Sequence, residues 1–210
     1  MANLIRVVGV GPGNPDYITP EAKNIIAGAD TLVGGERLLR DFARSGKEQF
    51  IIKNNLSEMV EFIKRYRDQG IVAVLASGDP MFYGIVEFLK KHFRADELQV
   101  CPGLSSMQLA CARLCISWHD AALYSVHGRK MEGLVNLVRS NPKVIVLTDP
   151  QKNPGLIAGE LTTAGISGKR IYVCENLSYE DERIGVYSQD NIPADLGKSG
   201  CVVVITDESQ

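Results

Sequence analysis

The 210-residue chain lacks several features that would place it in a specialised class. It has no surplus of basic residues, with 23 Lys and Arg against 25 Asp and Glu, so we do not expect a nucleic-acid partner. It has no uninterrupted apolar run of about 18 residues, as a membrane-spanning helix requires, and no secretory leader is visible. Its five cysteines include no C-x-x-C pair, which favours a reducing compartment. We therefore expect a cytoplasmic protein that binds neither membrane nor nucleic acid.

The composition is that of an ordinary globular protein, with 45% hydrophobic and 23% charged residues. At about 150 residues per domain, the length allows one or two domains. Apolar runs predict strands at 4–10, 49–53, 71–76, 98–101, 121–126, 143–147, 170–174 and 201–206. Helical patterns lie between them at 20–28, 56–69, 83–92, 104–114, 130–140 and 153–164. This alternation predicts an α/β fold with two mostly parallel sheets, in lobes 1–116 and 117–210.

Three loops that follow predicted strands carry residues suited to ligand binding. The first contains Gly9, Gly11 and Gly13, the second is Gly78-Asp79-Pro80, and the third is Pro102-Gly103-Leu104-Ser105-Ser106. Ligands of open α/β sheets bind at the carboxyl ends of strands, where glycines let the backbone come close and helix starts offer N–H groups. Each loop alone could be a plain turn, but three of one kind favour a site.

The familiar nucleotide-binding loops do not fit the first of these segments. A dinucleotide fingerprint G-x-G-x-x-G would need glycine where the chain has Asn14, and no acidic residue ends a second strand at the right distance. No phosphate-binding G-x-x-x-x-G-K-[ST] sequence occurs. The usual methyltransferase loop carries an acidic residue where this chain has Val7. A nicotinamide-dependent oxidoreductase or a nucleotide-binding module is therefore a disfavoured alternative.

Together with Thr19, the three loops resemble the tetrapyrrole methylases, and the resemblance extends over the whole chain. It implies a two-lobed fold with S-adenosylmethionine held between the lobes, and a homodimer. Three further stretches resemble the members that methylate C5 of a corrin precursor in cobalamin biosynthesis: Leu32-Val33-Gly34-Gly35-Glu36-Arg37, Ser125-Val126-His127-Gly128-Arg129 and Glu175-Asn176-Leu177-Ser178 with Glu182-Arg183. Members that act on another ring position, on diphthamide or on ribosomal RNA are the alternatives, and the last would require a basic surface.

The resemblance also implies which residues contact the methyl donor. They are Pro12, Gly78, Asp79, Phe82, Ser105 and Ser106 in the first lobe, and Thr148 and Leu177 in the second. A corrinoid carries several carboxylates, which cations and N–H groups would bind. We assign the corrinoid substrate to Gly11, Gly13, His127, Arg129 and Lys130.

We assign no catalytic residue and no metal ligand. Uroporphyrinogen-type members have Tyr-Asp-Arg where this chain has Gly34-Gly35-Glu36-Arg37, so their acidic residue is not carried over. Methyl transfer from a sulfonium depends chiefly on alignment and on the exclusion of water. Cys111, Cys115 and His119 would share one face of a continuous helix, but the helix is predicted to end near Leu114. Some relatives carry an added C15 domain, so we expect a separate C15-methylating and decarboxylating chain as a partner.

Overall fold

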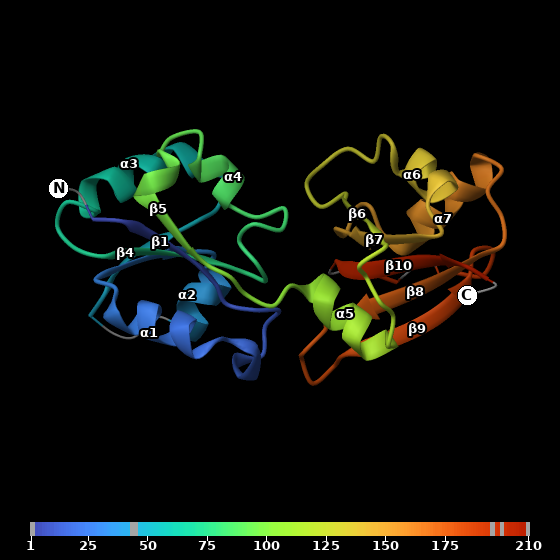
Figure 1. Ribbon diagram of the computed structural model, residues 1–210, viewed down its shortest axis with the longest axis horizontal. Helices are drawn as coiled ribbons and strands as arrows, with labels where there is room; N and C mark the ends of the chain where they lie inside the picture. Colours follow the sequence, from blue (N-terminus) through green and yellow to red (C-terminus); the bar gives the residue numbers. More distant parts are fainter. Residues whose placement is uncertain (1–2, 43–45, 194–195, 198–199, 209–210) are drawn as a thin grey trace. The chain divides into compact units, whose positions relative to one another are not determined.

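The structure is a computed structural model that describes residues 3–42, 46–193, 196–197 and 200–208. The chain divides into two compact units, Met1–Ser105 and Ser106–Gln210 (Figure 1). The division therefore lies between Ser105 and Ser106, whereas the sequence suggested a boundary between 116 and 117. The reason is that helix α5 (Ser106–Leu114) belongs to the second unit, where it packs against strand β10 (Cys201–Asp207).

The first unit is built on a five-stranded sheet in the order β3-β2-β4-β1-β5, in which all neighbouring strands are parallel. The strands are β1 (Ile5–Gly9), β2 (Thr31–Gly34), β3 (Glu48–Ile51), β4 (Val72–Ala76) and β5 (Leu98–Cys101). The helices are α1 (Pro20–Gly28), α2 (Glu36–Phe42), α3 (Leu56–Tyr66) and α4 (Val86–Leu89), with short 3-10 turns at Pro15–Tyr17 and Ala95–Glu97. Because β1 lies between β4 and β5, the carboxyl ends of these three strands are neighbours.

Both faces of this sheet are covered, so its central strands β1 and β4 are buried along almost their whole length. In β1, Ile5 and Val7 face the core formed with α3 and α4, while Val8 faces the core formed with α1 and α2. Figure 1 shows the two helix pairs on opposite faces of the sheet. Helix α1 is capped by Thr19, whose Oγ1 accepts a hydrogen bond of 3.1 Å from the Ala22 amide.

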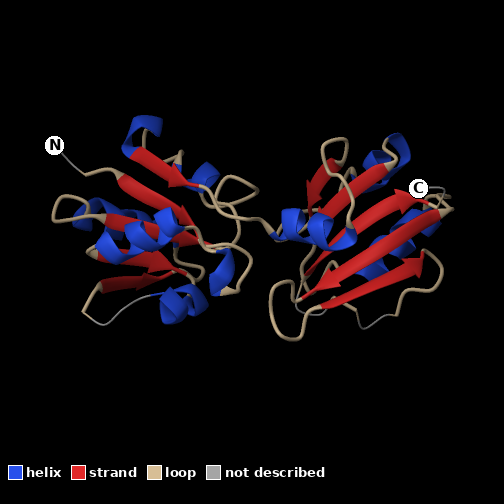
Figure 2. Ribbon diagram, turned by 60° about the horizontal axis from the view of Figure 1, so that its bottom comes forward, coloured by secondary structure: helices blue, strands red, loops and turns tan. Residues whose placement is uncertain are grey.

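The second unit contains a mixed sheet in the order β6-β7-β10-β8-β9, whose strands are labelled in Figure 1 and drawn in red in Figure 2. Its other elements are β6 (Ala122–Ser125), β7 (Lys143–Leu147), β8 (Lys169–Glu175), β9 (Arg183–Ser188), α6 (Leu134–Ser140) and α7 (Pro154–Thr163). β6 and β7 are parallel, whereas β10 runs antiparallel to both β7 and β8, and β9 runs antiparallel to β8. The α/β class is therefore confirmed, but this sheet is mixed rather than mostly parallel, because the chain returns as a hairpin and then inserts β10 between β7 and β8.

One face of the second sheet packs against α6 and α7. Leu134 and Val138 of α6 and Ile157 and Leu161 of α7 are almost fully buried in a single cluster with the strands. The described residues of that cluster include none from α5, which packs on β10 instead. Among the residues that the structure describes, no helix combines the length and apolar character needed to cross a bilayer.

Candidate functional site

In the first unit, the three glycine loops pack backbone against backbone. A Cβ atom added at Gly9 would lie 2.6 Å from the Gly103 nitrogen and 2.7 Å from the Gly78 oxygen. The Gly78 amide donates to the Gly11 carbonyl at 2.7 Å, and the reverse bond is 3.4 Å long. Glycine is thus required at Gly9 and Gly103 because any side chain would force the loops apart. The structure brings together the three loops that the sequence singled out.

Asp79 ties two of these loops together. Its Oδ1 accepts hydrogen bonds from the Met81 amide at 2.7 Å and the Phe82 amide at 3.2 Å. Its Oδ2 accepts from the Gly103 amide at 3.2 Å. The carboxylate therefore first organises the protein backbone, and only the remaining lone pairs of its oxygens are left for a ligand.

The other residues of the first unit that were assigned to the donor lie around the same strand ends. Pro12 is buried and follows Gly11, whose φ of 80° lies in the region that favours glycine. Ser105 is only 4% exposed, and its Cα would be 3.6 Å from a Cβ at Gly78. Phe82 is half-buried with its ring 5.1 Å from that of Tyr83 in an edge-on contact.

In the second unit, the predicted residues follow three strands whose carboxyl ends lie at one edge of the sheet. His127 comes after β6, Thr148 directly follows β7, and Leu177 follows β8. The start of β10 lies between the ends of β7 and β8, since Val202 pairs with Leu147 and Cys201 pairs with Glu175. Ser106 is the first residue of α5 in this unit.

The Thr148 hydroxyl is fully used within the protein. It donates to the Cys201 carbonyl at 2.9 Å and accepts from the Cys201 amide at 2.8 Å. Its side chain is buried, and the Cys201 thiol lies 3.2 Å away. Burial raises the pKa of the Cys201 thiol to about 11, so this sulfur is protonated at neutral pH. Thr148 therefore joins the end of β7 to the first residue of β10, Cys201, through its side chain.

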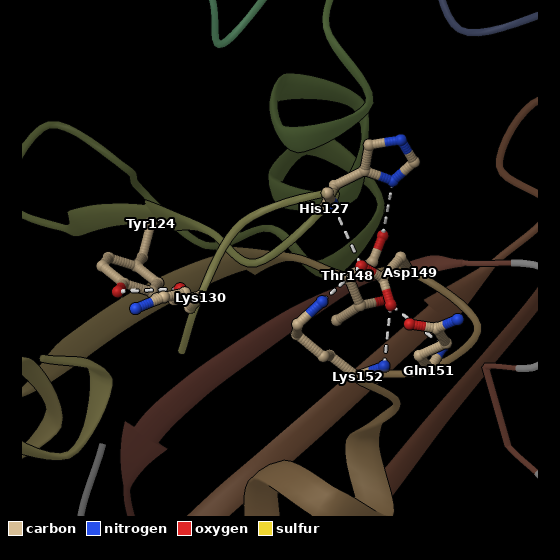
Figure 3. A network of polar contacts seen from close by, with 8 residues as sticks. Tyr124, His127, Lys130, Thr148, Asp149, Gln151 and Lys152 are labelled. Atoms are coloured by element: carbon tan, nitrogen blue, oxygen red, sulfur yellow. Dashed lines mark hydrogen bonds and ion pairs between the residues drawn. The ribbon is translucent and has the colours of Figure 1, made fainter. Parts of the chain in front are cut away.

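Asp149 organises the loops of this unit, and Figure 3 shows its contacts. Its Oδ1 accepts from the Gln151 amide at 2.9 Å and the Lys152 amide at 2.7 Å. Its Oδ2 accepts from the Gly128 amide at 3.0 Å and from the Lys152 ammonium at 3.1 Å. Burial alone would raise the pKa of Asp149, but these hydrogen bonds outweigh it and hold the pKa well below the usual range.

The three substrate candidates of the 127–130 segment do not all point the same way. The His127 Nδ1 lies 3.2 Å from the Thr148 carbonyl, so Nδ1 donates and the exposed ring presents Nε2 outward. The Arg129 amide donates to the Val126 carbonyl at 3.1 Å, and its side chain is exposed. Lys130 lies beside Tyr124, away from His127 (Figure 3), and its ammonium pairs with Glu132 at 3.2 Å.

Sequence reasoning assigned no role to Asp149, although a signal for it is present. Thr148-Asp149-Pro150 follows a buried strand just as Gly78-Asp79-Pro80 does, and both aspartates bind two amides of their own loop and a glycine amide of another loop. Comparing the two Asp-Pro sequences would have identified it.

Known proteins are similar to this chain in both sequence and fold. The cobalt-precorrin-7 C(5)-methyltransferase of Salmonella typhimurium is 39% identical over 98% of this chain and 100% of its own length. A precorrin-6Y C(5,15)-methyltransferase [decarboxylating] of Sinorhizobium sp is 32% identical over 86% of this chain, which matches 44% of that protein. The structure of the cobalamin biosynthesis precorrin-6Y methylase of Archaeoglobus fulgidus superposes with a TM-score of 0.73 at 25% identity and covers 97% of both chains. The model of the tetrapyrrole (corrin/porphyrin) methylases matches residues 5–191, and the chain belongs to that family.

Proposed function

We propose that this protein transfers the methyl group of S-adenosylmethionine to C5 of a corrin precursor in cobalamin biosynthesis. The relative from Salmonella typhimurium, which matches over its full length, is named a cobalt-precorrin-7 C(5)-methyltransferase. The observation that carries the proposal is the packing of Gly9, Gly78 and Gly103 at the carboxyl ends of β1, β4 and β5. This arrangement brings the backbone of three loops together where α/β sheets bind ligands, and it is found in a chain of the methylase family.

The residues of each unit fit a methyl donor of this kind. S-adenosylmethionine supplies an electrophilic methyl group on a sulfonium, and its polar groups call for main-chain partners and small hydroxyls. In the first unit we propose that Pro12, Gly78, Asp79, Phe82 and Ser105 bind the donor. In the second we propose Ser106, Leu177 and Thr148, the last through its main chain or methyl group because its hydroxyl is occupied by Cys201.

We propose that cations of the second unit bind the carboxylates of the corrinoid. His127 presents Nε2 outward because its Nδ1 donates to the Thr148 carbonyl. Arg129 follows a turn that Asp149 fixes through the Gly128 amide. Gly11 and Gly13 of the first unit offer backbone close to the strand ends, and Lys130 supports substrate binding more remotely, since it pairs with Glu132.

In this reaction the residues of the chain bind, orient and exclude water. A displacement at a sulfonium methyl is accelerated by holding the attacking ring carbon in line with the methyl–sulfur bond that breaks, which converts a bimolecular step into an effectively unimolecular one. The charge of the donor disperses in the transition state, so a dry environment favours the step. The close backbone packing of Gly9, Gly78 and Gly103 serves this purpose because each loop restricts the movement of the others.

The test is methyl transfer from a labelled donor to a corrin precursor, with the product examined by NMR. We expect the label at C5. Label at another ring carbon would move the assignment to another tetrapyrrole methylase. Binding should be measured separately by calorimetry with S-adenosylhomocysteine and with NAD. Binding of NAD and not of S-adenosylhomocysteine would contradict the proposal and favour a nucleotide-dependent oxidoreductase.

We further propose a cytoplasmic homodimer that works with a separate C15-methylating chain. The five thiols are free, which supports a reducing compartment. The edge strand β9 exposes Ile184 and Val186 on one face, which a second copy could cover. The Sinorhizobium protein, which matches this chain over 44% of its length, joins C5 and C15 methylation in its name, and this pairing of activities supports a C15-methylating partner. Sedimentation with Val186→Lys as the variant tests the dimer, since a monomeric wild-type protein would contradict it.

A further inference from the structure

The loop that carries Leu177 has an unusual backbone. Residues 176–182 connect β8 to β9, and Asn176 and Ser178 have φ values of 50° and 76°. This left-handed region is sparsely populated by residues other than glycine and persists only where the surroundings impose it. Leu177 between them is 5% exposed. The loop is therefore held in place by specific contacts.

Glu182 supplies the contact at the centre of this loop. Its Oε2 accepts a 2.7 Å hydrogen bond from the amide of Ser178, one of the two residues with positive φ. Asn176 adds a second contact across the loop, because its Nδ2 donates to Asp181 at 2.7 Å. The Glu182 side chain is only 21% exposed, so water competes poorly for its oxygens.

Arg113 in turn fixes the Glu182 carboxylate from another element. It lies in the last turn of α5, and its Nε donates to Oε1 of Glu182 at 2.7 Å, while Nη2 lies 3.4 Å from Oε2. The guanidinium thus engages both carboxylate oxygens, the geometry in which Arg is hardest to replace by Lys. The hydrogen bond from Arg113 is the main reason that the pKa of Glu182 lies below its usual value.

We propose that the Arg113–Glu182 pair is a positioning element that locks residues 176–182 in the conformation that presents Leu177 to the methyl donor. The pair joins that loop to α5, the helix that begins at Ser106, so it links two segments that we assign to donor binding. It does not itself touch the donor. The inference rests on the proposed function, because that function supplies the methyl donor that Leu177 would contact. An exposed ion pair by itself contributes little to stability, whereas Glu182 of this pair also binds the amide of Ser178, a residue with positive φ.

The experiment uses the full chain with Arg113→Lys, Arg113→Gln, Glu182→Gln and the double variant Arg113→Gln/Glu182→Gln. Glu61→Gln is the matched control, since Glu61 forms an exposed ion pair with Lys64 on α3. Calorimetry gives the Kd of S-adenosylhomocysteine, and a methyl-transfer assay gives KM for the donor and kcat at saturation. A thermal melt reports folding.

We expect Arg113→Gln and Glu182→Gln each to raise Kd and KM for the donor about tenfold, with kcat changed less than about twofold. The double variant should lose no more than either single variant, and Arg113→Lys should recover part of the affinity. Additive losses, or a Kd within about twofold of wild type, would overturn the positioning role. If Glu182→Gln fails to fold, the Kd values of Arg113→Lys and Arg113→Gln test the positioning role by the same limit of about twofold. Wild-type protein that binds no S-adenosylhomocysteine would instead refute the proposed function.

Discussion

Replacing Asp149 by Asn tests whether this carboxylate holds the loops of the second unit. The substitution keeps the shape of the side chain and one acceptor oxygen, which can still serve the Gln151 and Lys152 amides. The new NH₂ group takes the place of Oδ2 and faces two donors, the Gly128 amide and the Lys152 ammonium. Both hydrogen bonds are lost, and donor opposes donor at each.

The size of the effect follows from these contacts. A hydrogen bond to a charged group contributes about 1.5–3 kcal/mol, and a buried donor without a partner costs about 1–3 kcal/mol. The Lys152 side chain is 24% exposed and can recover water, so we count chiefly the Gly128 bond. We expect the free energy of unfolding to fall by about 3 kcal/mol, which lowers Tm by roughly 6–12 °C for a chain of this size.

Urea unfolding at pH 7 measures this loss, with Asp190→Asn as the control because Asp190 is an exposed carboxylate of the same unit. The pKa of Asp149 is lowered by folding, so the folded state binds fewer protons and the stabilisation is complete above the unfolded pKa. The difference between wild type and variant should stay constant above about pH 5 and shrink as the pH falls below about 4. A loss under about 1 kcal/mol at pH 7, or a difference that grows in acid, would refute the reasoning.

Three further predictions concern the same strand ends. Gly103→Ala should weaken S-adenosylhomocysteine binding in calorimetry at least about tenfold, because its Cβ would lie 2.3 Å from the Gly78 oxygen; unchanged binding would show that the loops can separate. Thr148→Val should lower the free energy of unfolding by about 2 kcal/mol, since the Cys201 amide loses its buried acceptor, while Thr148→Ser should restore most of it in the same denaturant experiment. His127→Ala should raise KM for the corrinoid in the transfer assay and leave the Kd of S-adenosylhomocysteine unchanged, and the opposite pattern would assign His127 to the donor.

Much of the first unit could be predicted because its signals are local. Strand β5 and helix α1 of this unit have the predicted bounds, as does β7 of the second unit. β2 was missed because it is a four-residue strand that runs directly into glycines. β9 was missed because it is an edge strand with exposed residues at most positions, and its two aliphatic residues, Ile184 and Val186, are separated by Gly185. Without β9 the antiparallel hairpin of β8 and β9 cannot be predicted, and neither can the mixed strand order of the second sheet.

The candidate site shows the same division between local and distant information. The glycine loops could be found because each follows its own strand, and their convergence follows from the adjacency of β4, β1 and β5. The engagement of Thr148 with Cys201 could not be found, since the two residues lie 53 positions apart and meet only because β10 is inserted between β7 and β8.

The two Asp-Pro sequences explain how loops of similar geometry can follow strands in two different kinds of sheet. The proline after each aspartate has no N–H group and a fixed φ, so the first amides within reach of the carboxylate are those two and three residues on. Asp79 and Asp149 both bind these two amides with Oδ1. Oδ2 then binds a glycine amide of another loop, Gly103 or Gly128, and Oδ2 of Asp149 also accepts from the Lys152 ammonium. Because this geometry depends on the residues after the strand and not on the direction of its neighbours, it serves a parallel sheet around β4 and a mixed sheet around β7 equally well.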